Sequence, residues 1–575
     1  MRTPSILRCL PLLACTLGSP SAFALPPSND DWANRIQILP AQLAAGFSDS
    51  QSTIAEATVD AGDPLLVCKN GDPQQRGNTV WYALDLTAVS APVYLNAAAI
   101  GYDSVLAVFT GSPGSFVPAT GACNDDGATS FAARFHGVRL LPGSNYSILV
   151  ARPAQNTNVA TLALTVGAAP QYIVSKVEDT LDGSCNADCS VREAVAASNV
   201  APGAILLPAG SFTLTRTGSD NTNANGDLDL LSGAGIYGVG NGASGTRIVG
   251  VSGDRVFDLD PANQINIGAT FNFADLAISG GGGIGPGAGI NAANGNDHLA
   301  LKNLLLENNS ATLLPGGAVH SNGPSVVDTS TVRNNSSAGN GGGLAFAAAN
   351  VLTRVDVFGS TIVGNQSTTS SSGGGGGIFS SGNLVVYNST FSGNSARFSG
   401  GGILSTTFNG RVNLQQVTLA GNTADSDNNL SGSGGGLRAE GSGASSLNSA
   451  FAGNRSSSSG DDCSRAPALT FAAAAGNHLE TTGTVTDCGF ASGSNSSGPA
   501  RLGALAPGIG PTATHVPLAG SPLIDLGDAA NCLSVDQRGQ PRPADGDLNG
   551  SSGCDIGAVE LNAQEGDALF RDSFE

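Results

Sequence analysis

The chain has 575 residues, a formal net charge of -20 and a pI near 4.5. A nucleic-acid-binding protein needs a basic surface to neutralise phosphates, so this charge excludes that class. Glycine fills 80 positions, about twice its usual share of roughly 7%, and this disfavours a helical bundle because each interior glycine costs a helix about 1 kcal/mol. The absence of a G-X-Y period excludes collagen, and the 40% hydrophobic content argues against disorder throughout. A β-rich, turn-dense protein of two or more domains remains.

Residues 1–24 have the features of a signal peptide. A basic start is followed by the apolar run 9–17, which is too short to span a bilayer. The small-x-small sequence A-F-A at 22–24 predicts cleavage before Leu25, and the alternative is a lipoprotein cut before Cys15. No other window approaches about 18 apolar residues, so we expect an exported chain with no transmembrane helix.

The cysteines indicate disulfides. Cleavage would remove Cys9 and Cys15, and an even number of cysteines in an exported chain is typical of a disulfide framework. A zinc site is disfavoured, because only His478 lies near a cysteine pair and no pair has the CxxC spacing. We expect local pairing, since each pair then lies inside one predicted module: Cys68–Cys123, Cys185–Cys189, Cys463–Cys488 and Cys532–Cys554.

Residues 25–168 are expected to form a β-sandwich. Short alternating runs separated by Gly, Pro and Asp turns predict strands at 79–84, 93–96, 104–109 and 146–151. The segments N-D-D-W-A-N at 29–34, V-W-Y at 80–82, Y-D-S-V-L-A-V at 102–108 and C-N-D-D at 123–126 resemble the pre-peptidase C-terminal-like domains of secreted bacterial proteins. That resemblance implies an accessory domain, linked with binding to substrate or matrix, that carries no catalysis.

Oxygen-bearing side chains gather in this sandwich. Asp103, Asn124, Asp125 and Asp126 offer the hard ligands that Ca²⁺ prefers. The alternative is that these residues cap turns. Calcium is the one cofactor that the composition of this segment suggests.

Residues 171–240 open a second module. Ser190 and Glu193 form the S-x-x-E capping box, which predicts a short helix over 190–197 with Val191, Ala194 and Val195 on one face. The sequence C-S-V-R-E-A at 189–194, which includes Arg192, resembles the CSLREA motif that begins many secreted bacterial right-handed parallel β-helices. A short amphipathic helix suits that position, because it covers the open hydrophobic end and the unpaired strand edges of a β-helix.

Residues 241–490 contain a repeat. The phrase of an apolar residue, two variable residues and asparagine recurs at intervals of 26 to 32 residues, and glycine runs ending in Val, Leu or Ile lie between the phrases. Short apolar runs in a unit of this length, without a helical period, favour an all-β right-handed parallel β-helix, a pectin-lyase-like solenoid. We expect the asparagines to adopt the left-handed conformation at one corner and to form a ladder through their amides: Asn309, Asn335, Asn365, Asn394, Asn422 and Asn454.

The paired G-G-A-[VIL] and F-x-x-N phrases resemble the repeats of the polymorphic outer-membrane proteins of chlamydiae. The resemblance implies β-helix coils on an exported, surface-displayed protein, and some members of that family are adhesins. This chain lacks the C-terminal membrane barrel of that family, so self-translocation is not implied.

Residues 491–562 are expected to close the β-helix. The segments 520–528, 536–543 and 553–560 resemble the choice-of-anchor Q endings of surface β-helix proteins, and 563–575 forms an acidic tail. Asp545, Asp547 and Asn549 open like a calcium loop, but Ile556 stands where an EF-hand has its bidentate glutamate. An EF-hand is therefore excluded and a weaker Ca²⁺ turn is the hypothesis; the run 221–229 is similar in character.

Catalytic motifs are sparse. Asp328 and Asp356 are 28 residues apart, about one repeat, and could stack, but nothing joins them to a nearby histidine, so we expect solvated turn residues. His298 and His320 are isolated and are expected at the surface or in turns. A polysaccharide lyase would need a basic proton abstractor, for which there are candidates by residue type only: Arg333, Arg354, Arg397 and Arg411.

The favoured function is adhesion or binding of carbohydrate or matrix by an exported β-helix protein. Rows of exposed Asn, Ser and Thr on a rigid face suit carbohydrate hydroxyls. A polysaccharide lyase or glycoside hydrolase and a non-catalytic envelope protein are the alternatives. We expect a monomer that is extracellular or on the outer surface of a Gram-negative-type bacterium, with a polysaccharide or cell-surface ligand and no nucleic acid.

Overall fold

The structure is a computed structural model that describes residues 25–66, 68, 76–125, 132–153, 161–251, 253–261, 268–348, 353–369, 373–406, 410–457, 460–481, 488–490 and 495–565. The predicted signal peptide, with Cys9 and Cys15, lies outside these residues, as does the tail beyond Glu565. None of the described helices is long and apolar enough to cross a membrane.

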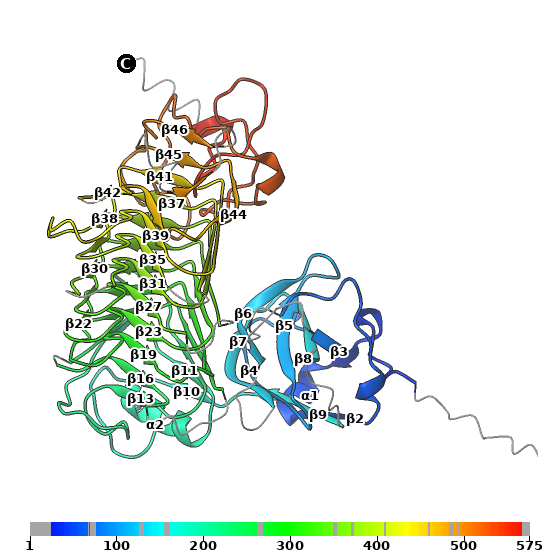
Figure 1. The fold of residues 1–575 in the computed structure, drawn as a ribbon. Helices are drawn as coiled ribbons and strands as arrows, with labels where there is room; N and C mark the ends of the chain where they lie inside the picture. The colour runs from blue at the N-terminus through cyan, green and yellow to red at the C-terminus, as the bar shows by residue number, and fades with distance from the viewer. Residues whose placement is uncertain are drawn as a thin grey trace, which may run out of the picture.

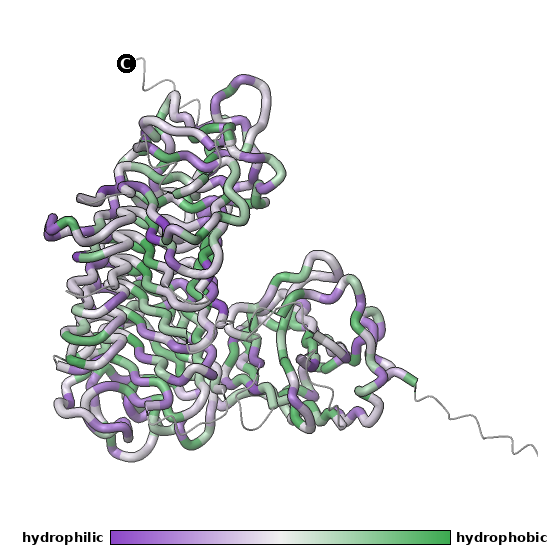
Figure 2. The backbone as a smooth tube through the Cα atoms, viewed as in Figure 1, coloured by the Kyte–Doolittle hydropathy of each residue, from purple (hydrophilic) through white to green (hydrophobic). Residues whose placement is uncertain are grey.

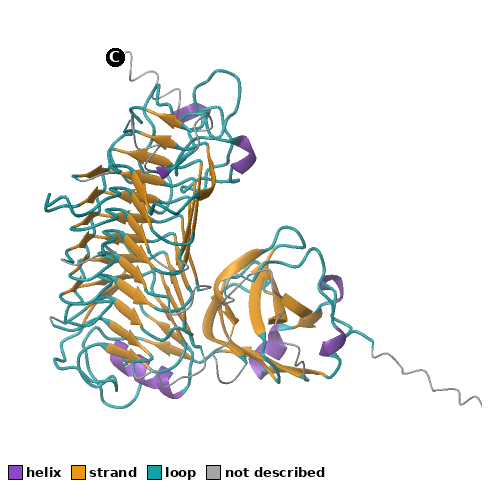
Figure 3. Ribbon diagram, viewed as in Figure 1, coloured by secondary structure: helices purple, strands orange, loops and turns teal. Residues whose placement is uncertain are grey.

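The N-terminal part consists of two facing β-sheets, as the alternating pattern predicts (Figures 1 and 3). Sheet A has the strand order β1 (Ile36–Ile38), β3 (Arg76–Asp85), β8 (Asn145–Pro153), β5 (Val105–Thr110) and β6 (Val117–Asp125). Sheet B has the order β2 (Phe47–Gln51), β9 (Leu162–Ala168), β4 (Val93–Ile100) and β7 (Ala133–Leu140). Short helices precede and connect these strands: η1 (Trp32–Asn34), α1 (Pro40–Ala45) and η2 (Ile54–Glu56).

Apolar side chains from the two sheets meet in one core. Val80 and Tyr82 on β3 pack with Leu95 on β4, and all three are fully buried. Alternation along β3 turns Trp81 to the opposite face, where its ring stacks on Phe116 at 5.2 Å between centroids. The four strands predicted from the sequence lie in β3, β4, β5 and β8, so that part of the prediction is confirmed.

The rest of the chain winds into a parallel β-solenoid, as predicted (Figure 1). A complete coil contributes one strand to sheet C, one to sheet D and one to sheet E, and the central coils add a two-residue strand of sheet F between D and E. Every strand pairs in parallel with the equivalent strand of the next coil, as β28 does with β32. The backbone N–H and C=O groups of the strands therefore hydrogen-bond to the neighbouring coils and not within their own coil.

The two longest solenoid sheets have eleven strands each. Sheet C consists of β10 (Gln171–Ile173), β11 (Ala204–Leu206), β14 (Ala234–Tyr237), β17 (Thr270–Ala274), β20 (His298–Lys302), β24 (Ser325–Asp328), β28 (Arg354–Phe358), β32 (Asn383–Tyr387), β36 (Arg411–Gln415), β40 (Gly443–Leu447) and β44 (Phe471–Ala475). Sheet D consists of β12 (Gly210–Thr213), β15 (Thr246–Val249), β18 (Ala277–Ser279), β21 (Leu305–Glu307), β25 (Thr331–Arg333), β29 (Thr361–Val363), β33 (Thr390–Ser392), β37 (Thr418–Ala420), β41 (Ala450–Ala452), β45 (His478–Leu479) and β46 (Ser496–Ser497).

The remaining two sheets have shorter strands. Sheet E consists of β13 (Leu228–Leu230), β16 (Phe257–Leu259), β19 (Ile290–Ala292), β23 (Val319–Ser321), β27 (Leu344–Phe346), β31 (Ile378–Ser380), β35 (Ile403–Ser405), β39 (Leu437–Ala439) and β43 (Cys463–Arg465). Sheet F consists of β22 (Ser310–Ala311), β26 (Ser336–Ser337), β30 (Gln366–Ser367), β34 (Ser395–Ala396), β38 (Thr423–Ala424) and β42 (Arg455–Ser456).

Alternation within each strand fills the solenoid with apolar side chains. In β28, Val355 and Val357 point inward and are fully buried, and they stack on Leu384 and Val386 of the next coil. Figure 2 shows hydrophobic segments recurring along the stacked strands. The inward residues form one continuous core from Val174 to Phe490.

The repeated asparagines form a buried ladder along the rod. The amide group of Asn365 and its backbone N–H both donate to Oδ1 of Asn394, each at 3.0 Å, and Asn394 donates in the same way to Asn422. All six predicted asparagines take part, and the ladder ends where Asn454 Nδ2 donates to the carboxylate of Asp462 at 3.0 Å. The predicted ladder is present.

The left-handed conformation does not fall on the ladder asparagines, so that detail of the expectation is wrong. It falls one residue earlier, at Asn308, Asn334, Gly364, Gly393, Gly421 and Gly453, whose φ angles lie between 54° and 65°. A left-handed residue at this point turns the following side chain into the corner, where it reaches its partner. Asparagine and glycine tolerate that conformation best.

The helix α2 (Val191–Val200) caps the first coil, and it ends three residues later than predicted. Ser190 Oγ accepts from the Glu193 backbone N–H at 3.1 Å, and Glu193 accepts in return from Ser190 N–H at 2.7 Å. Arg192 is fully buried, pairs with Asp179 at 2.7 Å and donates to backbone carbonyls of the loop 223–227. The motif thus joins the helix to the first coil through charge as well as apolar contact.

Three of the four expected disulfides are formed: Cys68–Cys123, Cys185–Cys189 and Cys532–Cys554. The structure does not join Cys463 to Cys488. Both side chains are buried in the solenoid core. There they pack as small apolar side chains, a role that cysteine fills readily.

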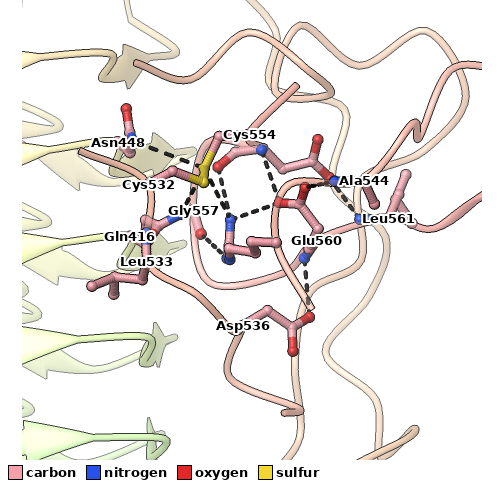
Figure 4. A network of polar contacts seen from close by, with 12 residues as sticks. Gln416, Asn448, Cys532, Leu533, Asp536, Ala544, Cys554, Gly557, Glu560 and Leu561 are labelled. Atoms are coloured by element: carbon pink, nitrogen blue, oxygen red, sulfur yellow. Dashed lines mark hydrogen bonds and ion pairs between the residues drawn. A yellow bond between two sulfur atoms is a disulfide. The ribbon is translucent and has the colours of Figure 1, made fainter. Parts of the chain in front are cut away.

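Residues 495–565, which include η3 (Ala529–Asn531), fold back along sheet D. A column of threonines on consecutive coils anchors them: Thr361 and Thr390 donate to Ala513 O and Gln537 Oε1, and Thr418 accepts from Ala558 N–H. Figure 4 shows the centre of this segment beside the Cys532–Cys554 disulfide, where Glu560 accepts from Ala544 N–H. Arg542 pairs there with Glu560 at 2.9 Å, and both side chains are fully buried.

Replacing one ladder residue is expected to destabilise the rod. Asn394→Ala leaves the buried backbone N–H and amide of Asn365 without their acceptor, at a cost of about 2 to 4 kcal/mol. Chemical denaturation followed by circular dichroism measures the loss. Asn429→Ala, at an exposed loop position of a neighbouring coil, is the control and should change stability by less than about 0.5 kcal/mol. Equal effects of the two variants would contradict a special role for the ladder.

The stability contributed by Glu193 is expected to depend on pH. Burial alone would raise its pKa, but hydrogen bonds from Ser190, Thr180, Asp182 and Lys176 outweigh burial and lower the pKa to about 2. A lowered pKa in the folded state stabilises the fold above the ordinary value near 4.5, and this contribution is lost as pH falls through about 2. At pH 7, Glu193→Gln should therefore lose about 2 to 3 kcal/mol. The gap between wild type and variant should narrow between pH 4.5 and 2; a gap that is constant with pH would rule out the ionised carboxylate as its cause.

Candidate functional site

The N-terminal sandwich is docked on the outer face of sheet C (Figure 1). Tyr237 on β14 is at the centre of the contact: its hydroxyl donates to Gly137 O at 2.8 Å and accepts from Arg139 N–H at 3.0 Å. The Arg139 guanidinium lies 4.7 Å from the centre of the Tyr237 ring and pairs with Asp275 at 2.5 Å. The ring of Tyr94, the cross-strand partner of Arg139, lies 5.3 Å from the Tyr237 ring. The two domains therefore meet through a buried aromatic and an ion pair.

A cleft of about 380 Å³ forms where the sandwich strand β6 meets sheet C. Residues 117–123 of β6, with Cys68, form one wall, and strands β20, β24, β28 and β32 form the floor. The floor side chains come from the outward positions of each strand, because the inward ones belong to the solenoid core. The cleft is thus built from both domains.

Two ion pairs lie in the cleft. Lys302 pairs with Asp328 at 2.8 Å, and both contact the hydroxyl of Thr120 from the sandwich. Arg354 holds Asp356 with Nε and Nη2, at 2.8 Å to each carboxylate oxygen. Each carboxylate has its own cation, an arrangement that suits recognition of polar groups more than proton transfer.

The expectation that Asp328 and Asp356 are solvated turn residues is wrong. Both lie in strands of sheet C, and they are 4% and 6% exposed. They do not occupy one column, because Asp328 stands opposite Phe358 and Asp356 stands opposite Val326. The sandwich and the neighbouring coils cover this face of sheet C, which we had expected to be exposed to solvent.

An aromatic pair continues the floor beyond the ion pairs. Phe358 and Tyr387 are opposite one another on β28 and β32, and their rings are parallel within 2° at 5.0 Å. Both are half-buried, and burial raises the pKa of Tyr387 so that its phenol stays neutral. Asn383, Asn413 and Arg411 follow on the outward positions of β32 and β36. A stacked aromatic pair is thus flanked by hydrogen-bonding groups.

The two isolated histidines are buried, which corrects the expectation of surface positions. His298 begins β20 and lines the cleft at 6% exposure, and His320 on β23 is 7% exposed and contacts Asn291. Burial lowers the pKa of each to about 4, so both are neutral at pH 7. Of the arginines considered as bases, Arg354, Arg333 and Arg397 are held in ion pairs with Asp356, Glu307 and Asp427, and Arg411 is exposed on β36.

Of the sandwich residues expected to bind Ca²⁺, Asn124 makes hydrogen bonds to other parts of the protein. Asn124 is fully buried, accepts from Arg134 N–H and donates to Thr270 on the solenoid, so it is a domain-interface residue. Asp125 is buried at the end of β6, and Asp103 is half-buried in a turn. Asp126 lies outside the described residues.

At the C-terminal end, Asp545 and Asp547 come together with Asp525, which the sequence pattern did not include. Carboxylate oxygens of the three lie within 4.8 Å of one another, and the residues are half-buried. Asn549 donates from its amide to Asp547 at 2.8 Å, and its side-chain oxygen accepts from Ser551 N–H. The acids could hold a cation, but the amide of Asn549 points its donor at the cluster.

No family model matches the chain, and no curated protein matches it. Among solved structures, the chain resembles pectate lyase Pel9A with a TM-score of 0.29 and 14% identity over 68% of this chain and 96% of that one. It also resembles the catalytic domain of a GH87 alpha-1,3-glucanase in complex with tetrasaccharides, with a TM-score of 0.20 and 12% identity over 75% and 98%, and the Agl-KA catalytic domain, with a TM-score of 0.21 and 12% identity over 77% and 87%. The function of this chain therefore has to be inferred from its own residues.

The cleft is expected to depend on Tyr237. Tyr237→Ala removes the ring that contacts Tyr94 and Arg139 and leaves the guanidinium without its aromatic partner, a loss of about 2 kcal/mol or more of docking energy. The sandwich should then separate more readily from the solenoid, which small-angle scattering would show as a larger radius of gyration. Tyr237→Phe keeps the ring and should give a smaller change. A scattering profile of Tyr237→Ala that matches wild type would show that other contacts suffice.

Proposed function

We propose that this protein binds carbohydrate in the cleft between its sandwich and sheet C, as an exported, surface-associated or extracellular β-helix protein. The observation that carries the proposal is the stacked pair Phe358 and Tyr387 on the cleft floor. Extended polysaccharides present flat, weakly polar ring faces and a rim of hydroxyls. A half-buried aromatic surface with polar neighbours complements both parts of such a chain.

The polar groups around the pair support the same function. Arg354 and Asp356, fixed by their mutual hydrogen bonds, are available on the cleft floor beside the rings. Asn413 contacts Asn383 and Ser445, so amides and hydroxyls continue along the face. Fixed donors and acceptors bind hydroxyls with little loss of side-chain entropy.

The direction of sheet C also suits a linear ligand. The outward positions repeat from coil to coil at about 4.8 Å, the spacing of hydrogen-bonded strands. A sugar chain lying along the rod would therefore contact successive coils. The three disulfides are typical of an extracellular protein, which agrees with an exported binding protein.

Binding is tested with residues 25–575 and a panel of polygalacturonate, alginate, a soluble β-glucan and chitin. We expect retention on at least one polymer, and Phe358→Ala or Tyr387→Ala should weaken that binding by about 10-fold, equivalent to about 1.4 kcal/mol. Phe379→Ala is the matched control, because Phe379 is a half-buried aromatic on β31 of sheet E, a different face of the same coil that carries Phe358. Affinity electrophoresis or pull-down gives the readout.

The same experiment separates binding from catalysis. New reducing ends or unsaturated products would replace the binding function with a lyase or hydrolase function and would direct mutagenesis to Asp328 and Asp356. Retention that is unchanged in both aromatic variants would place carbohydrate binding elsewhere. No retention on any polymer would favour a protein ligand or an envelope role.

A further inference from the structure

A column of acidic and polar side chains lies on the first coils, away from the cleft. In sheet E, Asp229 on β13 is opposite Asp258 on β16, which is opposite Asn291 on β19 and then His320 on β23. Asp227 precedes Asp229 by two residues. All three acids are buried, at 3% exposure for Asp227, none for Asp229 and 7% for Asp258, because the preceding loop folds over them.

The three carboxylates are poorly neutralised. Their oxygens lie within 4.8 Å of one another, and among the described residues Arg255 is the cation that pairs with them, contacting Asp258 and lying 3.5 Å from Asp227. A fourth carboxylate, Asp254, accepts from the Asp227 backbone N–H. Like charges opposite one another on neighbouring strands are destabilising, and burial strengthens the repulsion.

Several oxygens in the cluster lack hydrogen-bond donors. Oδ1 of Asp227 and Oδ1 of Asp229 are buried without a partner. The side-chain oxygen of Asn223, which is 1% exposed, is also without a donor, and the Asn223 backbone N–H donates to Asp229 at 2.7 Å. Buried acceptors of this kind are costly unless something binds them.

We propose that Asp227, Asp229 and Asp258, with Asn223 from the covering loop, form a binding site for Ca²⁺. The atoms that would coordinate the ion are all oxygens. Ca²⁺ prefers oxygen ligands, whereas Zn²⁺ and copper sites usually contain nitrogen or sulfur ligands. One carboxylate oxygen of each acid lies within 4.8 Å of the other two, so a single ion can contact all three. Ca²⁺ tolerates an irregular set of protein oxygens, whereas Mg²⁺ loses its water reluctantly and usually keeps several waters, so a buried cluster of protein oxygens favours Ca²⁺.

The ion would join the loop before β13 to the first two strands of sheet E. Arg192 of the cap helix already holds the backbone carbonyls of Asn223, Gly226 and Asp227. The site thus lies where the helix, the loop and the first coils meet. Without the ion, burial and the neighbouring carboxylates raise the pKa of Asp227 to about 9 and that of Asp229 to about 7.

The test uses residues 25–575 carrying Asp545→Asn and Asp547→Asn, so that the C-terminal acidic group does not contribute. In this background, protein dialysed against EDTA should gain Tm by about 3 °C or more when 1 mM CaCl₂ is added. Atomic emission after gel filtration should find about one calcium per chain. Adding Asp227→Asn and Asp229→Asn should abolish both effects.

The variant with Asp227→Asn and Asp229→Asn should reverse its order of stability relative to the parent when calcium is added, which a purely structural role of the two acids does not predict. In EDTA it should be at least as stable as its parent, because the repulsion is gone; in calcium it should be less stable, because the ion is lost. The proposal is overturned if the parent neither retains calcium nor gains Tm, or if the variant responds to calcium as the parent does. An equal rise with 1 mM MgCl₂ would overturn the assignment to calcium.

Discussion

Each coil of the solenoid hydrogen-bonds to the next in one fixed register, so a side chain at one repeat position lies against the side chain at that position in the following coil. Inward columns become the core, the corner column becomes the asparagine ladder, and outward columns become the surfaces that face ligands. A slip of one residue in any pair would exchange inside for outside. The ladder opposes such slips, because its buried amides find acceptors in one register only.

Interior and exterior columns accept different kinds of residue. The inward positions of sheet C hold valine and leucine in coil after coil, as Val355, Leu384 and Val412 show. The outward positions vary freely, since each outward side chain needs to match only its two neighbours. Chemistry therefore accumulates outside the rod: ion pairs and rings on sheet C, and carboxylates on sheet E.

The repeat allowed the fold to be predicted in detail, because period and corner residues are local properties of the chain. Much of the cleft was also present in that pattern. Lys302, Asp328, Phe358 and Tyr387 each stand seven residues before a ladder asparagine, so aligning the repeats would have placed the aromatic pair and one carboxylate in a single column.

The remainder could not be read from the sequence. The burial of Asp328 and His298 depends on a separate domain docking through Tyr237, and no local pattern encodes which face a sandwich covers. The joining of Asp525 to Asp545 likewise comes from the path of the C-terminal segment. The left-handed residue lies one position before each ladder asparagine. One residue of the corner bends the backbone and the next one directs its side chain inward, and the sequence pattern alone did not separate these two roles.

The asparagine ladder also has a polarity. Along the ladder, one N–H of each side-chain amide donates to the asparagine of the next coil, and the amide oxygen accepts from the asparagine of the preceding coil, so the ladder bonds from Asn309 to Asn454 all run in one direction. The same amides also donate to backbone carbonyls of the preceding coil, which ties each ladder residue to the coils on both sides. Asp462 accepts from the last amide, so a carboxylate, which has no N–H to pass on, ends the series. The two ends of the ladder therefore differ chemically, and its C-terminal end is an acceptor.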